Sequence, residues 1–558
     1  MGLFSVLGIG TRGLSASQLG MDVTGQNISN ADVEGYSRKR LNITPDYRYD
    51  GSYGQMGFGV EVVNIERIRN VYIDEQIRRQ NREVGYYEEI DHTLERVENV
   101  FIEPEDTGLQ SYLDEFFNSW QNLTKYPDDV AARTMTKTNA EILVDVFHNL
   151  SGELRDIRET RNDEIKQRVG KVNELSKEIF NLNLEIAHVE IGDQNANDSR
   201  DRRDRLLKEL SKLIDIQTTE NERGQVTVTT MGNIIVSPVD SQELEISTKT
   251  TKRADGTSFA EVSVRFSDSN RIYEPSGGQL KGLFESRDTI VPEYQQKLDK
   301  IARTIVEKVN EIHISGYNLH GYSGINFFDP SLTGASDIDV SASILQDVQN
   351  IAAAGDAEEK NGNDRINTTF GASPVQLYDR PPGDPSRQRI RNVMSGSVVV
   401  TNGASGVVLR PDVDYHVDYT LGQIQLLNAV HDGADLDVEF KYRTGTYAGP
   451  GDNSNAIAIA QLREKLVMEP DAHGRNTATL NQFYGSYIGQ LGLNRNEATS
   501  HLETRNYLIR QFETHQDSIA GVSLDEEMAE LIKYQHTYQA SARLISTAER
   551  MLDVLMNM

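Results

Sequence analysis

Residues 523–558 read SLDEEMAELIKYQHTYQASARLISTAERMLDVLMNM and predict one helix that continues to the last residue. Its apolar and aromatic side chains recur at steps of four and three, which places them on one helix face, close to a coiled-coil seam. Ser523 and Glu526 have the spacing of a capping box, so we expect the helix to begin there. The stripe comprises Leu524, Met528, Leu531, Gln535, Tyr538, Ala542, Ile545, Ala548, Leu552 and Leu555.

This terminal stripe has two interpretations. The helix either packs on its own domain, or serves as an assembly helix that pairs with the other end of the chain. Because a chain terminus usually frays, we expect a terminal helix this apolar to need a partner.

The N-terminal stretch MGLFSVLGIGTRGLSASQLGMDVTGQNISNADVEGYSRKRL offers that partner. It contains a column of large residues at strict seven-residue steps and a second column of mostly small ones, Leu3, Gly10, Ser17 and Thr24, which would let a neighbouring helix approach closely. Its glycines each cost about 1 kcal/mol relative to Ala, so we expect a helix only when it is packed. The predicted assembly interface comprises Leu7, Leu14, Met21, Ile28, Leu524, Met528, Leu531, Tyr538, Ile545, Leu552 and Leu555.

Composition restricts the classes of function. A chain of 558 residues is long enough for several domains. Its formal net charge of -28 argues against binding nucleic acid or an anionic membrane surface, both of which need clustered Lys and Arg. The absence of cysteine excludes disulfides and thiolate chemistry. No signal peptide or membrane-spanning run is recognisable, so the residues alone predict a cytoplasmic protein.

Helical periodicity dominates the chain outside two stretches. It covers residues 67–103, 109–126 and 129–216, resumes at 279, and returns again at 453. Between residues 222 and 278 the pattern alternates, which predicts a small antiparallel β domain. Residues 338–340 are expected to form a strand, and a short helix is expected near Ile344. The single tryptophan, Trp120, is expected to be a core anchor.

Residues 356–447 look like an insertion. We expect 356–385 to be a loop and the following four strand-like runs to form a compact β sandwich or barrel. The predicted fold is therefore α+β and multidomain, with its two terminal helices paired in a coiled-coil-like domain. The predicted domains are a terminal assembly domain (1–65 plus 520–558), a helical bundle (66–221 plus 279–355 plus 448–519), and two small all-β domains (222–278 and 356–447).

We find no catalytic motif among the hydrolase, metalloprotease and nucleotide-binding signatures, and predict no enzyme, no cofactor and no metal. Two acidic clusters in the insertion, at 412–418 and 432–437, lack the spacing of an EF-hand loop and are interpreted as solubility charges. The basic run around Arg200 is interleaved with Asp198, Asp201, Asp204 and Glu209, so we interpret it as a salt-bridged, solvated helix face.

The two ends together carry a resemblance. Residues 13–40 (GLSASQLGMDVTGQNISNADVEGYSRKR) paired with 521–555 resemble the flagellar axial proteins. Three interior blocks resemble one family among them, hook-associated protein 1, whose members join hook to filament. These blocks are SGGQLKGLFESRDTIVPEYQQKLDKI at 276–301, SGINFF at 323–328 and GDNSNAIAIAQL at 451–462. Residues 356–447 depart from the pattern.

The resemblance implies a structural protein that assembles helically and forms the hook–filament junction. It implies as partners further copies of the chain, the hook protein, a second hook-associated junction protein, and a cytoplasmic export chaperone that binds the C-terminal helix. It also implies export to the bacterial flagellum without a cleaved signal peptide, to an extracellular or a periplasmic location. The alternative that we keep open is a secreted surface adhesin or binding protein whose active part is the inserted β domain.

Overall fold

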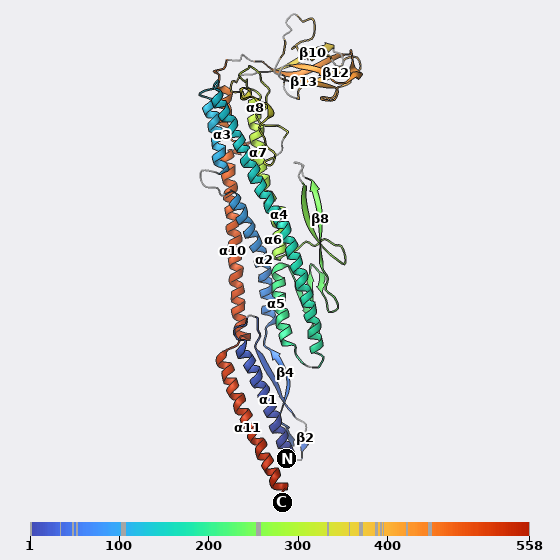
Figure 1. Ribbon diagram of the computed structural model, residues 1–558, viewed down its shortest axis with the longest axis vertical. Coiled ribbons are helices and arrows are strands. Elements are labelled where there is room, and N and C mark those ends of the chain that lie inside the picture. The colour runs from blue at the N-terminus through green and yellow to red at the C-terminus, as the bar shows by residue number, and fades with distance from the viewer. Residues whose placement is uncertain are drawn as a thin grey trace.

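The computed structural model describes most of the chain, namely residues 3–33, 35–46, 49–51, 54–101, 108–192, 194–252, 258–331, 334–355, 358–367, 372–384, 389–390, 393, 396–419, 422–444 and 449–556. The molecule is elongated, and both termini lie at one end of it (Figure 1). Helices α1 (Leu3–Ser29) and α11 (Leu524–Met556) lie side by side at that end.

Long helices make up the body. They are α2 (Val71–Phe101), α3 (Leu109–Leu123), α4 (Val130–Val189), α5 (Asn197–Leu213), α7 (Val291–His313) and α10 (Leu480–Ala520), with the shorter α6 (Gly278–Glu285), α8 (Ala342–Gln346) and α9 (Ser454–Ala460). Local sequence sets their ends. Asp129 caps α4 by accepting a hydrogen bond from the Ala131 N–H at 2.9 Å. Thr479 and Gln482 form a capping box at the start of α10.

The body contains two separate apolar clusters. The first lies where α2, α3, α4, α7 and α10 meet, and contains Trp120, which is fully buried as predicted and lies 5.2 Å from Phe327 between ring centroids. The second lies around the C-terminal half of α4, α5, α6 and the neighbouring strands. Helix α8 forms near Ile344 as predicted, but the predicted strand at 338–340 is reduced to a single bridge between Val340 and Phe328.

Small antiparallel sheets accompany the helices. The pairs are β1 (Lys39–Pro45) with β4 (Val60–Arg67), β2 (Tyr49–Gly51) with β3 (Gly54–Met56), β8 (Leu244–Lys252) with β9 (Ser258–Phe266), and β16 (Met468–Pro470) with β17 (Asn476–Ala478). Strands β5 (Gln217–Glu220), β6 (Val226–Thr230) and β7 (Asn233–Val236) form a three-stranded sheet. The fold class is thus α+β, with mostly helix and several small sheets.

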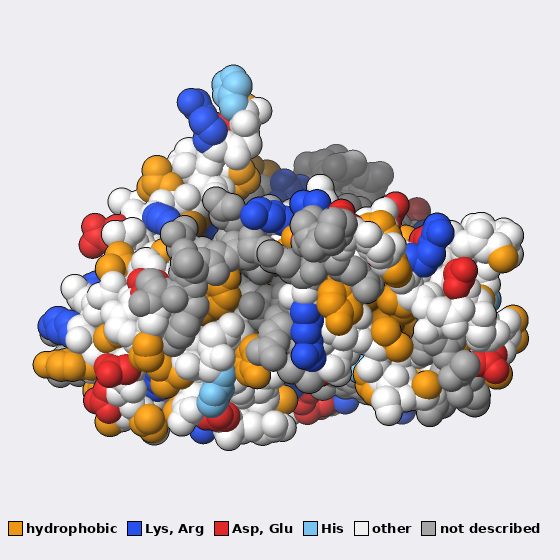
Figure 2. Space-filling view, turned by 90° about the horizontal axis from the view of Figure 1, so that it is seen from above, with side chains coloured by type: hydrophobic (Ala, Val, Ile, Leu, Met, Phe, Trp, Pro, Cys, Tyr) orange, Lys and Arg blue, Asp and Glu red, His pale blue; other side chains and the backbone are white. Residues whose placement is uncertain are grey.

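The stretch read as an insertion lies at the end opposite the termini (Figure 1). It contains two three-stranded sheets with their own apolar cluster, ordered β10-β15-β12 and β11-β14-β13. Their bounds are β10 (Glu358–Asn367), β11 (Val375–Gln376), β12 (Val399–Asn402), β13 (Tyr415–Asp418), β14 (Gln423–Leu426) and β15 (Asp435–Thr444). Seen from this end, hydrophobic side chains lie among charged ones on the surface (Figure 2).

One expectation for this region was wrong. Residues 358–367 are not a loop but strand β10, which pairs along its whole length with β15. The strand is polar because only its alternate residues face inward, and these are Gly362, Asp364 and Ile366. Gly362 leaves room for the Phe440 ring, and the buried Asp364 carboxylate accepts a hydrogen bond from the Tyr378 N–H at 2.9 Å. Because two of its three inward residues are a glycine and an acid, the strand lacks the alternation of hydrophobic and polar residues from which a strand is predicted.

Candidate assembly surface

Helices α1 and α11 pack antiparallel, with small residues of α1 against α11. A β-carbon on Gly10 would lie 2.7 Å from Ile545 Cγ1, and one on Gly13 would lie 2.7 Å from Ser541 Oγ. One on Gly20 would lie 2.6 Å from the Tyr534 ring. These distances are shorter than any carbon contact, so the two helices lie closer than ordinary side chains would allow.

The contact repeats every seven residues on both helices. Gly13, Gly20 and Asn27 of α1 meet Ser541, Tyr534 and Glu527 of α11 in that order. Ser17 and Thr24 are buried on the same side of α1. The small column that the sequence singled out therefore lies on the covered face.

The predicted interface residues lie at two different depths in the single chain. Leu524 and Met528 are exposed, at 53% and 48%. The others are half-buried: Leu7, Leu14, Met21 and Ile28 on α1, and Leu531, Tyr538, Ile545 and Leu552 on α11. The side chain of Leu555 lies outside the described part of the chain. The structure of one chain does not bring all eleven residues together.

A polar anchor holds the other end of the helix pair. The Asn27 amide nitrogen donates to the Lys39 carbonyl at 2.9 Å and to Glu527 Oε2 at 3.0 Å. Its oxygen accepts from the Lys39 N–H at 3.0 Å and from the Tyr36 hydroxyl at 2.9 Å. Glu527 is buried and also accepts from Arg38 Nε at 2.6 Å. Asn27 thus ties α1, α11 and strand β1 together.

Asn27 is absent from the predicted interface, although the sequence contains a signal for it. Asn27 lies seven residues after Gly20, in the column that faces α11, and a lone polar residue in such a column often fixes register. Burial, and the nearby carboxylates of Asp198, Asp201 and Glu527, raise the pKa of Tyr36 to about 12. Its hydroxyl therefore stays protonated and continues to donate to Asn27.

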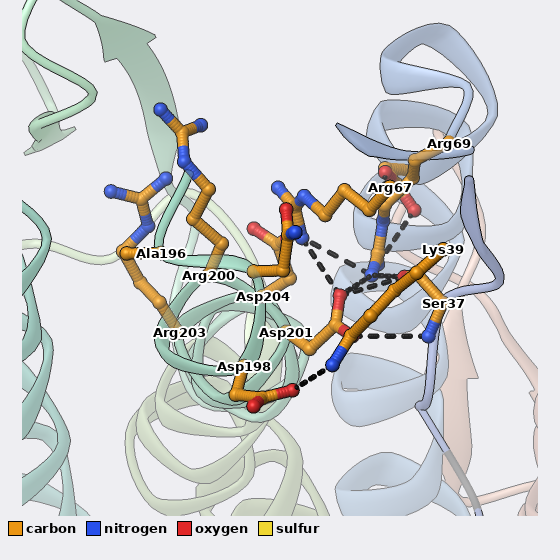
Figure 3. A network of polar contacts seen from close by, with 12 residues as sticks. Ser37, Lys39, Arg67, Arg69, Ala196, Asp198, Arg200, Asp201, Arg203 and Asp204 are labelled. Atoms are coloured by element: carbon orange, nitrogen blue, oxygen red, sulfur yellow. Dashed lines mark hydrogen bonds and ion pairs between the residues drawn. The ribbon is translucent and has the colours of Figure 1, made fainter. Parts of the chain in front are cut away.

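A network of charged groups joins the β1–β4 hairpin and the segment before it to α5 of the body (Figure 3). Asp201 of α5 accepts from the Ser37 N–H at 3.0 Å, the Ser37 hydroxyl at 2.7 Å and Arg67 Nη1 at 2.9 Å. Arg67 also bonds Asp204 at 2.6 Å, and Lys39 bonds Asp198 at 2.6 Å. Helix α5 thereby holds the start of β1 and the end of β4, which pair with each other.

The interpretation of this stretch as a salt-bridged, solvated face was right for its exposed residues, such as Asp198 and Glu209, but wrong for two others. Its ion pairing is present, but Asp201 and Arg203 are buried, and Arg203 Nη1 donates to the Asn183 amide oxygen at 3.1 Å. Burial raises the pKa of the Asp204 carboxyl, but the guanidinium groups of Arg67 and Arg69 outweigh it and hold the pKa below its ordinary value. Asp201 and Asp204 face inward because Arg67 of the hairpin bonds to both carboxylates.

A polar hollow of about 830 Å³ lies where the helix pair meets the body. Its lining comes from α2, α5, α10 and the segment before β1, and includes Arg38, Arg69, Asp74 and Glu513. The chain passes from α10 to α11 beside it, through Gly521, Val522 and Ser523.

Large apolar side chains remain exposed on the helix pair. On α1 this is Phe4, and on α11 the exposed residues are Leu524, Met528, Ile532, Leu544, Met551, Val554 and Met556. Exposed apolar groups gathered on one element are typical of a surface that another protein covers.

Other chemistry finds little support. Across the described residues no group of three or more His, Asp or Glu could hold a metal ion. Within the two acidic clusters, Asp412 lies 3.0 Å from His416 Nδ1, and Asp437 pairs with Arg365 at 2.6 Å. Of the helices that the structure describes, none is both long and apolar enough to cross a membrane.

Three family models match the chain. Residues 94–328 match the flagellar hook-associated protein FlgK helical domain, residues 7–36 the flagella basal body rod protein, and residues 517–558 the flagellar basal body rod FlgEFG protein C-terminal region. The last two matches correspond largely to α1 and α11.

Similar proteins extend over nearly the whole chain. The flagellar hook-associated protein 1 of Bacillus subtilis is 25% identical, over 98% of this chain and 96% of that protein. Those of Salmonella typhimurium and Escherichia coli are 26% and 25% identical, over 98% of each chain. The solved flagellar hook junction protein FlgK from Burkholderia pseudomallei shares the fold, with a TM-score of 0.57 and 16% identity, over 80% of this chain and all of that one.

Proposed function

The chain belongs to the flagellar hook-associated protein 1 family, and from this membership we propose that it assembles helically through α1 and α11 to form the junction between hook and filament. It is a structural component of the bacterial flagellum. The alternative of a surface adhesin finds no support among the relatives.

The observation that carries the assembly mechanism is the exposed apolar side of the helix pair. Within one chain, Ile545 and Tyr534 of α11 pack on the glycines of α1 and Asn27 bonds Glu527, whereas the large side chains of Met528, Met551 and other residues of α11 stay exposed beside this contact. Removing them from water would contribute about 25 cal/mol per Å² of apolar area, repeated at every subunit of a lattice. Further copies of the same helix pair are the natural cover.

The finer partners are also proposals. We propose that the assembled chains contact the hook protein on one side and a second hook-associated junction protein on the other. We propose that a cytoplasmic chaperone covers the C-terminal helix before export, because exposed Leu and Met side chains would otherwise self-associate. The flagellum is the proposed destination, reached without cleavage of a signal peptide. We propose no catalytic role.

We also propose the predicted division into domains: 1–65 with 520–558, 66–221 with 279–355 and 448–519, 222–278, and 356–447. In support, the described members of the apolar cluster of the insertion all lie within residues 366–442. The paired terminal helices support the first domain.

The test replaces exposed residues of α11 by aspartate. Met528→Asp with Met551→Asp places charges on the outward side, where both residues are about half exposed. We expect a folded chain whose helix pair is intact but which no longer assembles, because an unpaired buried charge costs several kcal/mol per site. Sedimentation would measure assembly, and motile cells would show whether filaments stay attached.

The matched control is Gln539→Asp with His536→Asp, two exposed polar positions on the same helix. It adds the same charge without removing apolar surface, and we expect it to assemble. Normal assembly of the Met528 and Met551 variant would refute the proposed surface.

A further inference from the structure

A polar layer crosses the body between its two apolar clusters. Along α4 the first cluster ends at Ile157 and the second begins at Ile165. Along the α6–α7 segment the second cluster ends at Leu283 and the first begins at Val291. The gap is filled by buried polar side chains, namely Glu89, Thr93, Arg161, Asn162, Ser286 and Arg287.

The layer coincides with an irregular helical turn. A π-helical turn, η1 (Ser286–Ile290), joins α6 directly to α7, and the Val291 N–H donates to the Ser286 carbonyl five residues earlier. Such turns insert a residue into a helix and are a recognised cause of bends. The Thr93 and Ser286 hydroxyl oxygens lie 2.8 Å apart across the layer, which links η1 to α2.

Pro292 leaves the Arg287 carbonyl without the backbone donor that this turn would otherwise supply. Continuing the same bonding pattern would require an N–H at residue 292 for the Arg287 carbonyl, and proline has none. A side chain of another helix takes that place, because Arg158 Nε of α4 donates to the Arg287 carbonyl at 3.0 Å. At this one carbonyl, a side chain of α4 takes the place of a backbone donor of the α6–α7 segment.

The ionic contacts that cross the layer from α2 to α4 are long, whereas the short pair of Arg161 is with Glu164 of its own helix, at 2.5 Å. The Glu89 carboxylate lies 3.4 Å from Arg161 and 3.4 Å from Arg168. Burial raises the pKa of Glu89 and lowers that of Arg161, although each offsets the other in part. Among the described residues, no acceptor lies within hydrogen-bonding distance of Arg161 Nε. Polar contacts of this kind hold the helices less firmly than interlocked apolar side chains do.

We propose that this layer is a bending point, at which the two apolar clusters move relative to one another as separate units. Apolar packing is interrupted there, and one of the crossing helices lacks a regular bonding ladder at the same level. The inference rests on the geometry of the body and does not depend on the proposed junction role.

The test measures distances between pairs of spin labels, which is practical because the chain contains no cysteine of its own. Labels at Glu307→Cys on α7 and Glu209→Cys on α5 span the layer, whereas Glu307→Cys with Asp145→Cys on α4 stay beside the first cluster; all three positions are exposed or nearly so. Pro292→Ala restores the missing N–H. We expect it to narrow the distance distribution of the spanning pair and to leave the other pair unchanged.

Glu293→Ala is the control, because it alters the neighbouring exposed position, whose carboxylate pairs with Lys297 on the same helix face, and keeps the proline. It should narrow neither distribution. The proposal is overturned if Pro292→Ala leaves the spanning pair unchanged, or narrows both pairs equally.

Amide exchange on the unlabelled chain gives a second measurement that needs no substitution. We expect residues 158–164 and 286–290 to exchange faster than residues 143–157 and 165–179 on either side. Exchange in the layer as slow as in both flanking clusters would also overturn the proposal.

Discussion

Single glycines decide how closely α1 approaches α11. Gly20 faces the Tyr534 ring, whereas a β-carbon on Gly25 would meet no described atom within 4 Å apart from its chain neighbours and the backbone of its own helix. The two positions differ in what surrounds them but not in helical propensity. They therefore separate the intrinsic cost of glycine from its structural use.

We predict opposite effects for Gly20→Ala and Gly25→Ala. Gly25→Ala should stabilise α1 by up to about 1 kcal/mol, the usual gain over glycine in a helix. Gly20→Ala should destabilise the pair by about 1–2 kcal/mol, because the new methyl group displaces the Tyr534 ring. Amide exchange of residues 5–28 in the monomer would measure both. Equal effects at the two sites would contradict the role given to Gly20.

A second residue, His313, is buried in the first apolar cluster as a neutral ring. Its Nε2 accepts from the Ala352 N–H at 2.8 Å, so Nδ1 carries the proton and donates to the Ile325 carbonyl at 2.7 Å. Burial lowers the pKa of His313 from 6.5 to about 4. The unfolded chain therefore takes up a proton between these values that the folded chain does not.

The sign of the resulting pH dependence follows. The stability contribution of His313 is complete above pH 6.5 and is lost progressively as the pH falls toward 4, by roughly 3 kcal/mol in total. We predict that the stability advantage of the wild type over His313→Gln shrinks by that amount across this range. Fluorescence of Trp120, whose ring centroid lies 6.2 Å from that of His313, would follow unfolding. A pH-independent difference would contradict the prediction.

At the scale of elements, the buried Asp201 carboxylate is one of three carboxylates of α5 that fasten the β1–β4 hairpin. Asp201 accepts from Ser37 and Arg67, whereas its neighbour Asp198 pairs with Lys39 from a position where the carboxylate side chain is 83% exposed. Helix α5 thus carries a buried and an exposed carboxylate that pair with the same hairpin, and their contributions to its stability can be compared directly.

We predict that Asp201→Asn loosens the hairpin and that Asp198→Asn does not. Removing the buried charge leaves Arg67 with a weakened set of partners and should cost about 3 kcal/mol, against less than about 1 kcal/mol for Asp198, whose carboxylate is exposed. Amide exchange of residues 37–41 and 65–69 would report the loss locally. Matching exchange rates in both variants would show that the hairpin is held by other contacts.

At the scale of the whole molecule, the inserted β region leaves and rejoins the body at one place. The Gly355 N–H donates to the Asp452 carboxylate at 3.0 Å, and the Asn455 N–H donates to the Ala353 carbonyl at 3.1 Å. Among the residues that the structure describes, the apolar clusters of the body contain none between Ala353 and Ala456. The body is complete without the insertion.

We therefore predict that replacing residues 358–444 by a short glycine linker leaves the body folded. Thermal unfolding followed by Trp120 fluorescence should be shifted little, and cells carrying the variant should keep their filaments attached. Loss of attached filaments from a folded variant would assign the insertion a necessary part in the junction.

Much of this molecule follows from the sequence alone. The seven-residue steps of the N-terminal stretch and the stripe of the C-terminal stretch predict two helices, and both are present in the structure. The change of period from helical to alternating predicts where strands begin, as at β6 and β12. These features are local, since they depend on residues only a few positions apart. A single sequence is therefore enough to predict them.

Only the tertiary structure decided which faces are covered. The periodicity of the sequence predicts which residues share a face of a helix or strand. The residues that cover that face come from elsewhere in the chain. The small column of α1 is covered because α11 returns to it, and Asn27 is satisfied because Lys39 and Glu527 arrive from two other elements. Arg203 is buried, and the polar strand β10 exists, for the same reason. From the sequence alone, a polar residue is predicted to be exposed, because the residue that bonds to it lies far away along the chain.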